Sequence, residues 1–416
     1  MLPNHASMPL RYRILDSLGS GAEGLGMPLT RMDAERLHQL AERETGLSDF
    51  GDLYYREALD VVLQSIEKDA DLHFFGRFGT RMVFLTHLVQ RLLFVEAQKR
   101  KPDIFNSEMN PPFFIVGIPR AGTTFLQRML SADPANAGMP MWRLYRPFAI
   151  EGKKDDRLEK TRWELGFRRP MFPEMDTKHV IREDTEEECI WMQGVTFHTI
   201  SFWVITPVFS YAEWYLAQGR KKSYEEYGLL LKAQQQATPE QRLVLKAPDH
   251  TPHLDALLSA VPNARIIQLH RNPTTCLTSA NSMYYSAHRA VTHNINVKRM
   301  AETNKKMYTC YLEGGRRCRE DPAVDNAVLD VQYDQMVKEP LQTIRDIYAR
   351  FGVPWTAQYE ERLKAFISSH PKDQHGAHRY TPEQFGQSAE ELDKHFAPFL
   401  PYPGDRGRIE KDRVRG

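Results

Sequence analysis

The first hundred residues carry apolar side chains at intervals of three and four positions, with charged side chains between them. This spacing predicts amphipathic helices over residues 32–43, 53–70 and 81–99. The pattern changes at residues 113–116, where Phe-Phe-Ile-Val forms a short continuous apolar run. Such a run is typical of a strand that is buried on both faces. We therefore expect a helical N-terminal region over residues 1–110, followed by a core that contains strands.

Strand-like and helix-like segments alternate after residue 113. Strands are predicted over residues 243–245, 265–269 and 327–331, and helices over residues 224–237, 251–260, 274–290 and 341–351. Alternation at this spacing predicts an α/β fold, in which helices flank a parallel sheet. We place this core at residues 111–355 and expect residues 356–416 to form a C-terminal extension that packs on it.

Composition and charge narrow the class of protein. The chain has 416 residues, of which 41% are hydrophobic and 26% charged, as in soluble globular proteins. Lys and Arg number 55 against 54 Asp and Glu, so no overall basic field would attract nucleic acid or an anionic membrane. The four cysteines form no C-x-x-C pair, which favours reduced thiols and a cytoplasmic location.

The most apolar later segment, residues 200–215, includes Pro207 and Glu213. It is also shorter than the roughly 20 residues that a spanning helix needs. We therefore expect a buried wall there and no transmembrane segment.

A glycine-containing loop follows the first predicted strand. Residues 117–124 read Gly-Ile-Pro-Arg-Ala-Gly-Thr-Thr, which is close to the nucleotide-phosphate loop G-x4-G-K-[ST]. Glycines let backbone N–H groups close around phosphate oxygens, and the start of the following helix adds partial positive charge. We expect a phosphate group to be held by Arg120, Ala121, Gly122, Thr123, Thr124 and Phe125. Because Thr123 stands where the loop lysine should be, a triphosphate hydrolase is disfavoured.

Another glycine pattern is set aside. Residues 19–24 match G-x-G-x-x-G, but Gly26 and Pro28 interrupt the helix that a dinucleotide site requires. We expect a loop there.

A second anion site is indicated where the strand at residues 265–269 ends. Arg271 leaves this strand as Asn272 and Pro273 begin a helix, and Ser279 lies about two turns along that helix. Arg271 and Ser279 could therefore share one phosphate group.

These two motifs together resemble the sulfotransferases that use 3′-phosphoadenosine 5′-phosphosulfate, in particular their broad bacterial branch. The resemblance implies a phosphate-loop-like fold, a glycine loop that holds the 5′-phosphosulfate, and an Arg271 and Ser279 pair that holds the 3′-phosphate. It also implies that Tyr333, after the strand at residues 327–331, faces the nucleotide. No metal is expected.

Transfer of a sulfuryl group needs positive charge on the departing oxygen and a base for the acceptor proton. Arg120 is the candidate for the charge, with Lys246 as a supplement. His250 is the candidate base, because an imidazole titrates near neutral pH. His253 and the acidic cluster Glu183, Asp184 and Glu187 remain alternatives.

No motif in the sequence identifies the acceptor of the sulfuryl group. The aromatic segment at residues 197–215 would favour a small molecule with an apolar or aromatic body if it lines the acceptor site. The flanking regions are the expected place for acceptor selection or for contacts in a homo-oligomer. Two other functions stay open: a nucleoside or small-molecule kinase on the same scaffold, and a non-enzymatic nucleotide-binding scaffold protein.

Overall fold

The computed structural model describes residues 9–25, 27, 29–171, 178–370 and 380–400. Contacts divide the chain into two compact units, and neither is continuous in sequence. Unit 1 comprises Met1–Met109, Met139–Pro239 and Ser282–Thr303, and unit 2 comprises Asn110–Gly138, Glu240–Asn281 and Asn304–Gly416.

Unit 2 is built on a parallel sheet whose strand order is β2-β3-β1-β4-β5. The strands are β1 (Phe113–Val116), β2 (Asn136–Gly138), β3 (Arg242–Lys246), β4 (Arg265–His270) and β5 (Val328–Gln332). Every residue of β1 is buried, as its continuous apolar run requires. The predicted strands and the α/β fold are confirmed. The short strand β2, which has no apolar run, was not predicted.

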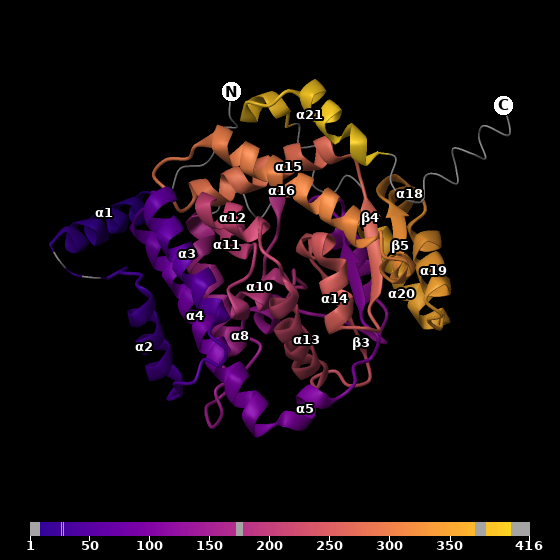
Figure 1. Ribbon diagram of the computed structural model, residues 1–416, viewed down its shortest axis with the longest axis horizontal. Coiled ribbons are helices and arrows are strands. Elements are labelled where there is room, and N and C mark those ends of the chain that lie inside the picture. The colour runs from indigo at the N-terminus through magenta and orange to yellow at the C-terminus, as the bar shows by residue number, and fades with distance from the viewer. Residues whose placement is uncertain (1–8, 26, 28, 172–177, 371–379, 401–416) are drawn as a thin grey trace. The chain divides into compact units, whose positions relative to one another are not determined.

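Helices flank this sheet within unit 2 (Figure 1). The helix α6 packs on β1 and β3, and α19 packs on β5. The helical elements of unit 2 are α6 (Thr123–Ser131), η3 (Pro248–His253), α14 (Leu254–Ala260), α17 (Pro322–Ala327), α18 (Tyr333–Lys338), α19 (Pro340–Arg350), α20 (Ala357–Ser369), η4 (Pro382–Phe385), α21 (Ala389–Phe396) and η5 (Ala397–Phe399). Two helices, α15 (Pro273–Arg289) and α16 (Val297–Cys318), pass from one unit to the other.

Unit 1 is helical in its described residues. It contains α1 (Leu10–Gly24), α2 (Ala34–Thr45), α3 (Tyr54–Asp69), α4 (Phe74–Arg100), α5 (Pro102–Asn106), α7 (Met141–Tyr145), α8 (Arg157–Arg168), η1 (Arg169–Met171), α10 (Ile190–Gln193), η2 (Gly194–Thr196), α11 (Ser201–Ile205), α12 (Phe209–Leu216) and α13 (Lys221–Gln235). The predicted loop at residues 19–24 is wrong, because α1 continues to Gly24. The predicted wall is confirmed, since Phe202, Trp203, Phe209 and Tyr211 are buried.

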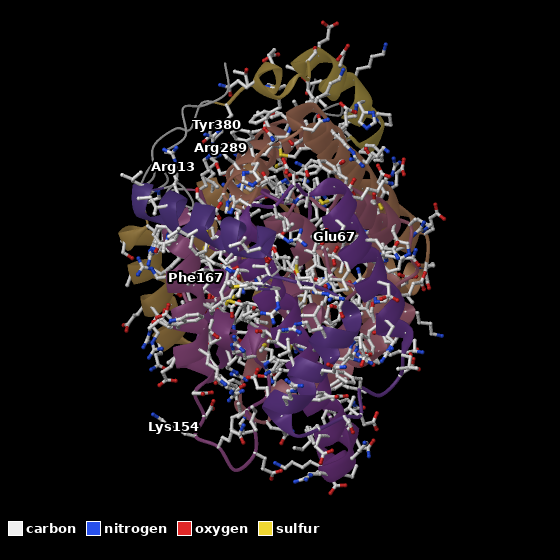
Figure 2. The ribbon with its side chains drawn as sticks, turned by 90° about the vertical axis from the view of Figure 1, so that its left-hand side faces the viewer. Arg13, Glu67, Lys154, Phe167, Arg289 and Tyr380 are labelled. Atoms are coloured by element: carbon white, nitrogen blue, oxygen red, sulfur yellow. The ribbon has the colours of Figure 1, made fainter. Side chains whose placement is uncertain are left out.

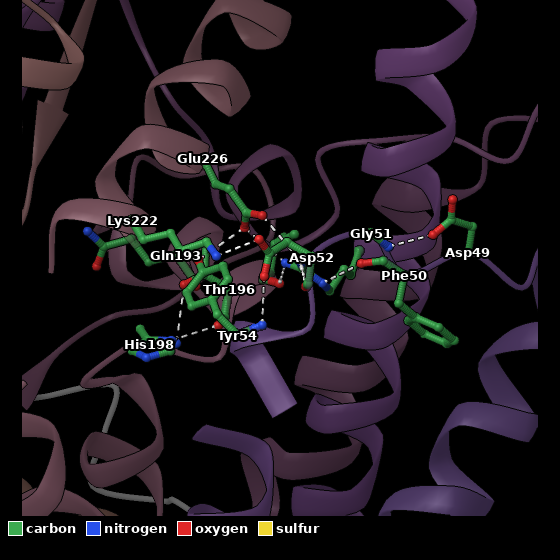
Figure 3. Close-up of polar contacts among 12 residues, drawn as sticks. Asp49, Phe50, Gly51, Asp52, Tyr54, Gln193, Thr196, His198, Lys222 and Glu226 are labelled. Atoms are coloured by element: carbon green, nitrogen blue, oxygen red, sulfur yellow. Dashed lines mark hydrogen bonds and ion pairs between the residues drawn. The ribbon is translucent and has the colours of Figure 1, made fainter. Parts of the chain in front are cut away.

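A buried ion pair between Arg91 and Glu226 ties the segments of unit 1 together. Figure 3 shows Glu226 with Asp52 and Tyr54, which belong to the same cluster. Arg91, in α4, is fully buried and lies 2.9 Å from the carboxylate of Glu226 in α13. Its guanidinium also donates to the main-chain oxygens of Phe50 (2.9 Å) and Asp52 (2.7 Å). The hydroxyl of Tyr54 donates to the same carboxylate at 3.1 Å. A single arginine thus connects α4, α13 and the loop that precedes α3.

None of the described helices is long and apolar enough to cross a membrane.

We expect Arg91→Met to lower the free energy of unfolding by about 3–5 kcal/mol, because it leaves Glu226 as a largely buried charge without its cation. The matched control is Lys99→Met in the same helix. Lys99 pairs with Asp49, but both side chains are more than half exposed. Its loss should cost no more than about 1 kcal/mol. Urea unfolding followed by circular dichroism measures both changes, and equal effects would contradict the central role of Arg91.

Candidate active site

The strand ends gather the candidate residues at one edge of the sheet in unit 2. Because all strands are parallel, their carboxyl ends meet at the same edge, where α/β proteins bind ligands. The glycine loop follows β1, Lys246 ends β3, and Arg271 comes directly after β4. Tyr333 comes directly after β5.

Two positions of the loop, 117 and 122, require glycine because any side chain there would clash with its neighbours. Gly122 caps the N-terminus of α6 with a φ of 98°. A β-carbon at this position would lie 2.8 Å from the ring of Tyr333. Gly117, where the loop begins, has a φ of 134°, and a β-carbon there would lie 2.4 Å from the main-chain oxygen of Leu269. The loop therefore runs close to the end of β4 and to Tyr333, which follows β5.

Arg120 adopts an unusual backbone conformation at the tip of this loop. Its φ is 68°, in the left-handed region that L-residues avoid. Its main-chain oxygen accepts a hydrogen bond from the guanidinium of Arg271 at 3.0 Å and from the thiol of Cys276 at 3.5 Å. Its own guanidinium donates to the hydroxyl of Ser279 at 3.2 Å. The structure thus brings three predicted residues, Arg120, Arg271 and Ser279, into one bonded group.

Cys276 was not among the predicted site residues, and its thiol is fully buried. Burial raises its pKa to about 12, although the nearby guanidinium groups of Arg271 and Arg120 act in the opposite direction. The thiol therefore stays protonated at neutral pH and can act as a donor to the oxygen of Arg120. Its position three residues before Ser279, on the same helix face, was the available signal.

Two further residues that the sequence did not indicate hold the part of the loop that precedes Arg120. The buried hydroxyl of Tyr308, in α16, donates to the main-chain oxygen of Pro119 at 2.7 Å. The hydroxyl of Thr251, in η3, accepts from the amide of Gly117 at 2.9 Å and lies 3.1 Å from its carbonyl oxygen. These contacts fix the direction of the main chain, and no sequence motif could reveal them.

The ends of β4 and β5 are held together beside the loop. The guanidinium carbon of Arg271 lies 4.0 Å from the centre of the Tyr333 ring. His270 lies 2.6 Å from a carboxylate oxygen of Asp330, which is also paired with Arg319 at 2.6 Å. Burial opposes ionisation of Asp330, but the hydrogen bonds from Arg319 and His270 prevail and lower its pKa. A buried charged group therefore fixes the strand end from which Arg271 extends.

The candidate bases lie in two different units. His250 is fully buried in unit 2, with its ring edge-on to Phe114 at a centroid distance of 5.4 Å. Lys246 is also buried, and His253 is partly exposed.

The acidic cluster belongs to unit 1. There Glu183 pairs with Arg162 at 2.7 Å, Glu187 lies 3.2 Å from His179, and Asp184 is exposed. A hydrogen bond from Arg162 lowers the pKa of Glu183, so this carboxylate is ionised at neutral pH.

We expect Gly122→Ala to lower affinity for adenosine 3′,5′-bisphosphate at least about tenfold, because the added methyl group must displace the Tyr333 ring. The matched control is Gly352→Ala. Gly352 has a φ of 60° and open space at its β-carbon position. Both variants should lose about 1–2 kcal/mol of stability from backbone strain, but the control should bind normally. Titration calorimetry measures the affinity, and equal affinities would refute this role of the loop.

Comparison with known proteins agrees with this geometry. Residues 111–357, more than half of the chain, match the Sulfotransferase family. The omega-hydroxy-beta-dihydromenaquinone-9 sulfotransferase Stf3 of Mycobacterium bovis is 24% identical over 320 residues, which cover 74% of this chain and 78% of that protein. The crystal structure of sulfotransferase STF1 from Mycobacterium tuberculosis has a TM-score of 0.73 at 27% identity, covering 88% of this chain and 99% of that one. Sulfotransferase STF9 from Mycobacterium avium shares the fold, with a TM-score of 0.78 at 24% identity over 89% and 96% of the two chains. The chain therefore belongs to the sulfotransferase family, and the predicted resemblance to this family is confirmed.

Proposed function

We propose that this enzyme transfers a sulfuryl group from 3′-phosphoadenosine 5′-phosphosulfate to a hydroxyl, or an amine, of a lipophilic small molecule. The observation that carries the proposal is the bonded group of Arg120, Arg271 and Ser279 at the carboxyl ends of β1 and β4. A donor with two separate anionic groups needs two cationic positions at a fixed spacing, and this group supplies both.

The residues at the strand ends suit such a donor. Phosphate oxygens would bind the backbone amides between Ala121 and Phe125, where Thr123 and Thr124 begin α6. Gly122 would allow the Tyr333 ring to lie against this loop. Arg271 and Ser279 would hold the 3′-phosphate, and Tyr333 would face the nucleotide. The bound donor would supply an activated sulfuryl group on a phosphate leaving group.

The chain's own residues would supply charge and a proton acceptor. The guanidinium of Arg120 would neutralise the oxygen that departs. Lys246, at the end of the neighbouring strand, would add to this charge. His250, in the segment that follows β3, would accept the proton of the acceptor hydroxyl or amine. His253 is the second candidate for the base, and the acidic cluster in unit 1 is the third.

A lipophilic acceptor is supported by two observations. The name of the relative Stf3 gives a hydroxylated menaquinone, a lipid alcohol, as the acceptor of that protein. In this chain the wall formed by Phe202, Trp203, Phe209 and Tyr211 offers apolar aromatic surface to such a body if it lines the acceptor site. We further propose a cytoplasmic enzyme that can form a homo-oligomer and whose four cysteines are reduced thiols. A screen of polyprenyl alcohols, phenols, sugars and amines with labelled donor tests the acceptor class.

The preferred nucleotide distinguishes a sulfotransferase from a kinase. Adenosine 3′,5′-bisphosphate should bind without metal, and at least about tenfold more tightly than ATP with magnesium, because Thr123 replaces the lysine that a γ-phosphate requires. Titration calorimetry with and without a chelator measures this difference. A preference for ATP with magnesium would instead support a kinase, and binding without any turnover would support a scaffold protein.

Substitution of Arg271 and of His250 separates donor binding from catalysis. Arg271→Ala should weaken bisphosphate binding roughly 10- to 100-fold, because a charge-assisted hydrogen bond is lost. His250→Ala should leave this affinity unchanged and lower kcat at least about 100-fold. Arg271→Lys is the control that keeps the charge but loses the planar fork. Full turnover by His250→Ala would move the base to another residue, and His253→Ala is then the next variant to measure.

A further inference from the structure

One face of helix α16 contacts both the glycine loop and the segment that contains His250. From Asn304 onward this helix belongs to unit 2, as do the loop and residues 246–253. Positions 308, 311, 315 and 318 recur at intervals of three and four, so they share one face of the helix. At the first of them, Tyr308 holds the glycine loop through its bond to the main-chain oxygen of Pro119. The other three positions face residues 249–255.

Two glycines bring α16 into close contact with this segment. A β-carbon at Gly314 would lie 2.5 Å from the β-carbon of Pro252, and one at Gly315 would lie 3.2 Å from the main-chain oxygen of Thr251. One turn further, the thiol of Cys318 lies 3.5 Å from the main-chain oxygen of Pro252. Because these glycines place no side chain between the two elements, the position of η3 follows that of α16.

A buried hydrogen bond joins α16 to the residue before His250. The hydroxyl of Tyr311 donates to a carboxylate oxygen of Asp249 at 2.9 Å, and each of these two residues is 1% exposed. A carboxylate loses its water on burial, so it settles where protein donors reach it. Asp249 directly precedes His250, and both belong to η3. The bond from Tyr311 therefore helps to fix the main chain from which the imidazole of His250 extends.

The chemistry of this contact suits a positioning role better than a packing role. Two apolar side chains of the same shape would serve the stability of the fold about as well as a buried carboxylate and hydroxyl. A hydrogen bond sets a direction as well as a distance, which apolar packing does not. A general base needs this precision, because it must lie within hydrogen-bond reach of the proton that it removes.

We infer that Tyr311 is a positioning residue for the base and that it holds His250 in place through Asp249. This inference rests on the proposed function, in which His250 is the base. Tyr308, one turn earlier on the same face of α16, holds the glycine loop. One helix thus sets the positions of the loop and of the base together. Loss of the Tyr308 hydroxyl should therefore affect donor binding, whereas loss of the Tyr311 hydroxyl should affect catalysis.

Single phenylalanine substitutions test the inference, because each removes one hydroxyl and keeps the ring. Tyr311→Phe should lower kcat roughly tenfold and leave the affinity for adenosine 3′,5′-bisphosphate within about twofold of the wild type. Tyr308→Phe should weaken that affinity at least about fivefold. The matched control is Tyr285→Phe in α15, which should change neither quantity. The hydroxyl of Tyr285 accepts from Arg289, an exposed side chain that Figure 2 labels.

Turnover is measured as transfer of a labelled sulfuryl group to geranylgeraniol, a polyprenyl alcohol, or to the best acceptor of the screen described above. Titration calorimetry measures the affinity for the bisphosphate. Urea unfolding checks that Tyr308→Phe and Tyr311→Phe lose similar stability, since each loses one buried hydrogen bond. A purely structural role would give both variants the same kinetic defect.

The variant His250→Ala shows whether Tyr311 acts through the base. In that background, Tyr311→Phe should lower kcat by no more than about twofold. A further tenfold loss would overturn the inference, because Tyr311 would then act on another group. Two other results would also overturn it: a normal kcat for Tyr311→Phe, or an equal loss of bisphosphate affinity in the two tyrosine variants.

Failure of this inference differs from failure of the proposed function. A wild type that transfers the sulfuryl group, with Tyr311→Phe equally active, refutes only the role of Tyr311. Full turnover by His250→Ala would refute the inference together with the assignment of the base, and would leave the transferase activity standing. A wild type that transfers the sulfuryl group to no acceptor would refute the proposed function, and this inference with it.

Discussion

The candidate active site depends on one hydrogen bond, from the guanidinium of Arg271 to the main-chain oxygen of Arg120. It connects the turn after β1 with the turn after β4 and helps to hold Arg120 in a backbone conformation that costs about 1–2 kcal/mol. The thiol of Cys276 reinforces it from the same helix that provides Ser279. One short stretch, residues 271–279, therefore determines the position of the loop cation and of the proposed second anion site together. A disturbance of either site is expected to reach the other through Arg120.

Charge in this protein is arranged locally and not as a net field. Arg91 in unit 1 is neutralised by Glu226 and serves the fold. Arg120 and Arg271 in unit 2 contact main-chain and hydroxyl oxygens near the carboxyl edge of the sheet. The formal net charge of +1 therefore gives little information about what the protein binds. A nearly neutral chain can hold a strongly anionic ligand when a few cations converge on one edge of a sheet.

The sequence predicted the sheet well where burial dictates composition. Strands β1, β3 and β4 were located to within one residue at each end, because each is an apolar run too short for a buried helix. The strand β2 was not predicted, because Asn136–Gly138 is short and contains no apolar run. The helix α1 was not predicted, because its glycines are typical of a loop and its large apolar side chains are exposed in place of forming a buried stripe. At the site, the motifs located Arg120, Arg271 and Ser279, whereas Tyr308 and Thr251 act on main-chain atoms that only the folded chain brings near them.

The strand order has a consequence for synthesis of the chain on the ribosome. β1 lies at the centre of the sheet, yet its two neighbours, β3 and β4, are encoded roughly 130 and 150 residues later. Translation proceeds at about 5–20 residues per second, so roughly 6–25 s pass between synthesis of the Phe-Phe-Ile-Val segment and synthesis of its first partner strand. During this interval a fully apolar segment that is meant for the sheet interior must be shielded, either by the helices already made or by a chaperone. The arrangement that places the glycine loop at the middle of the sheet thus makes the nascent chain prone to aggregation.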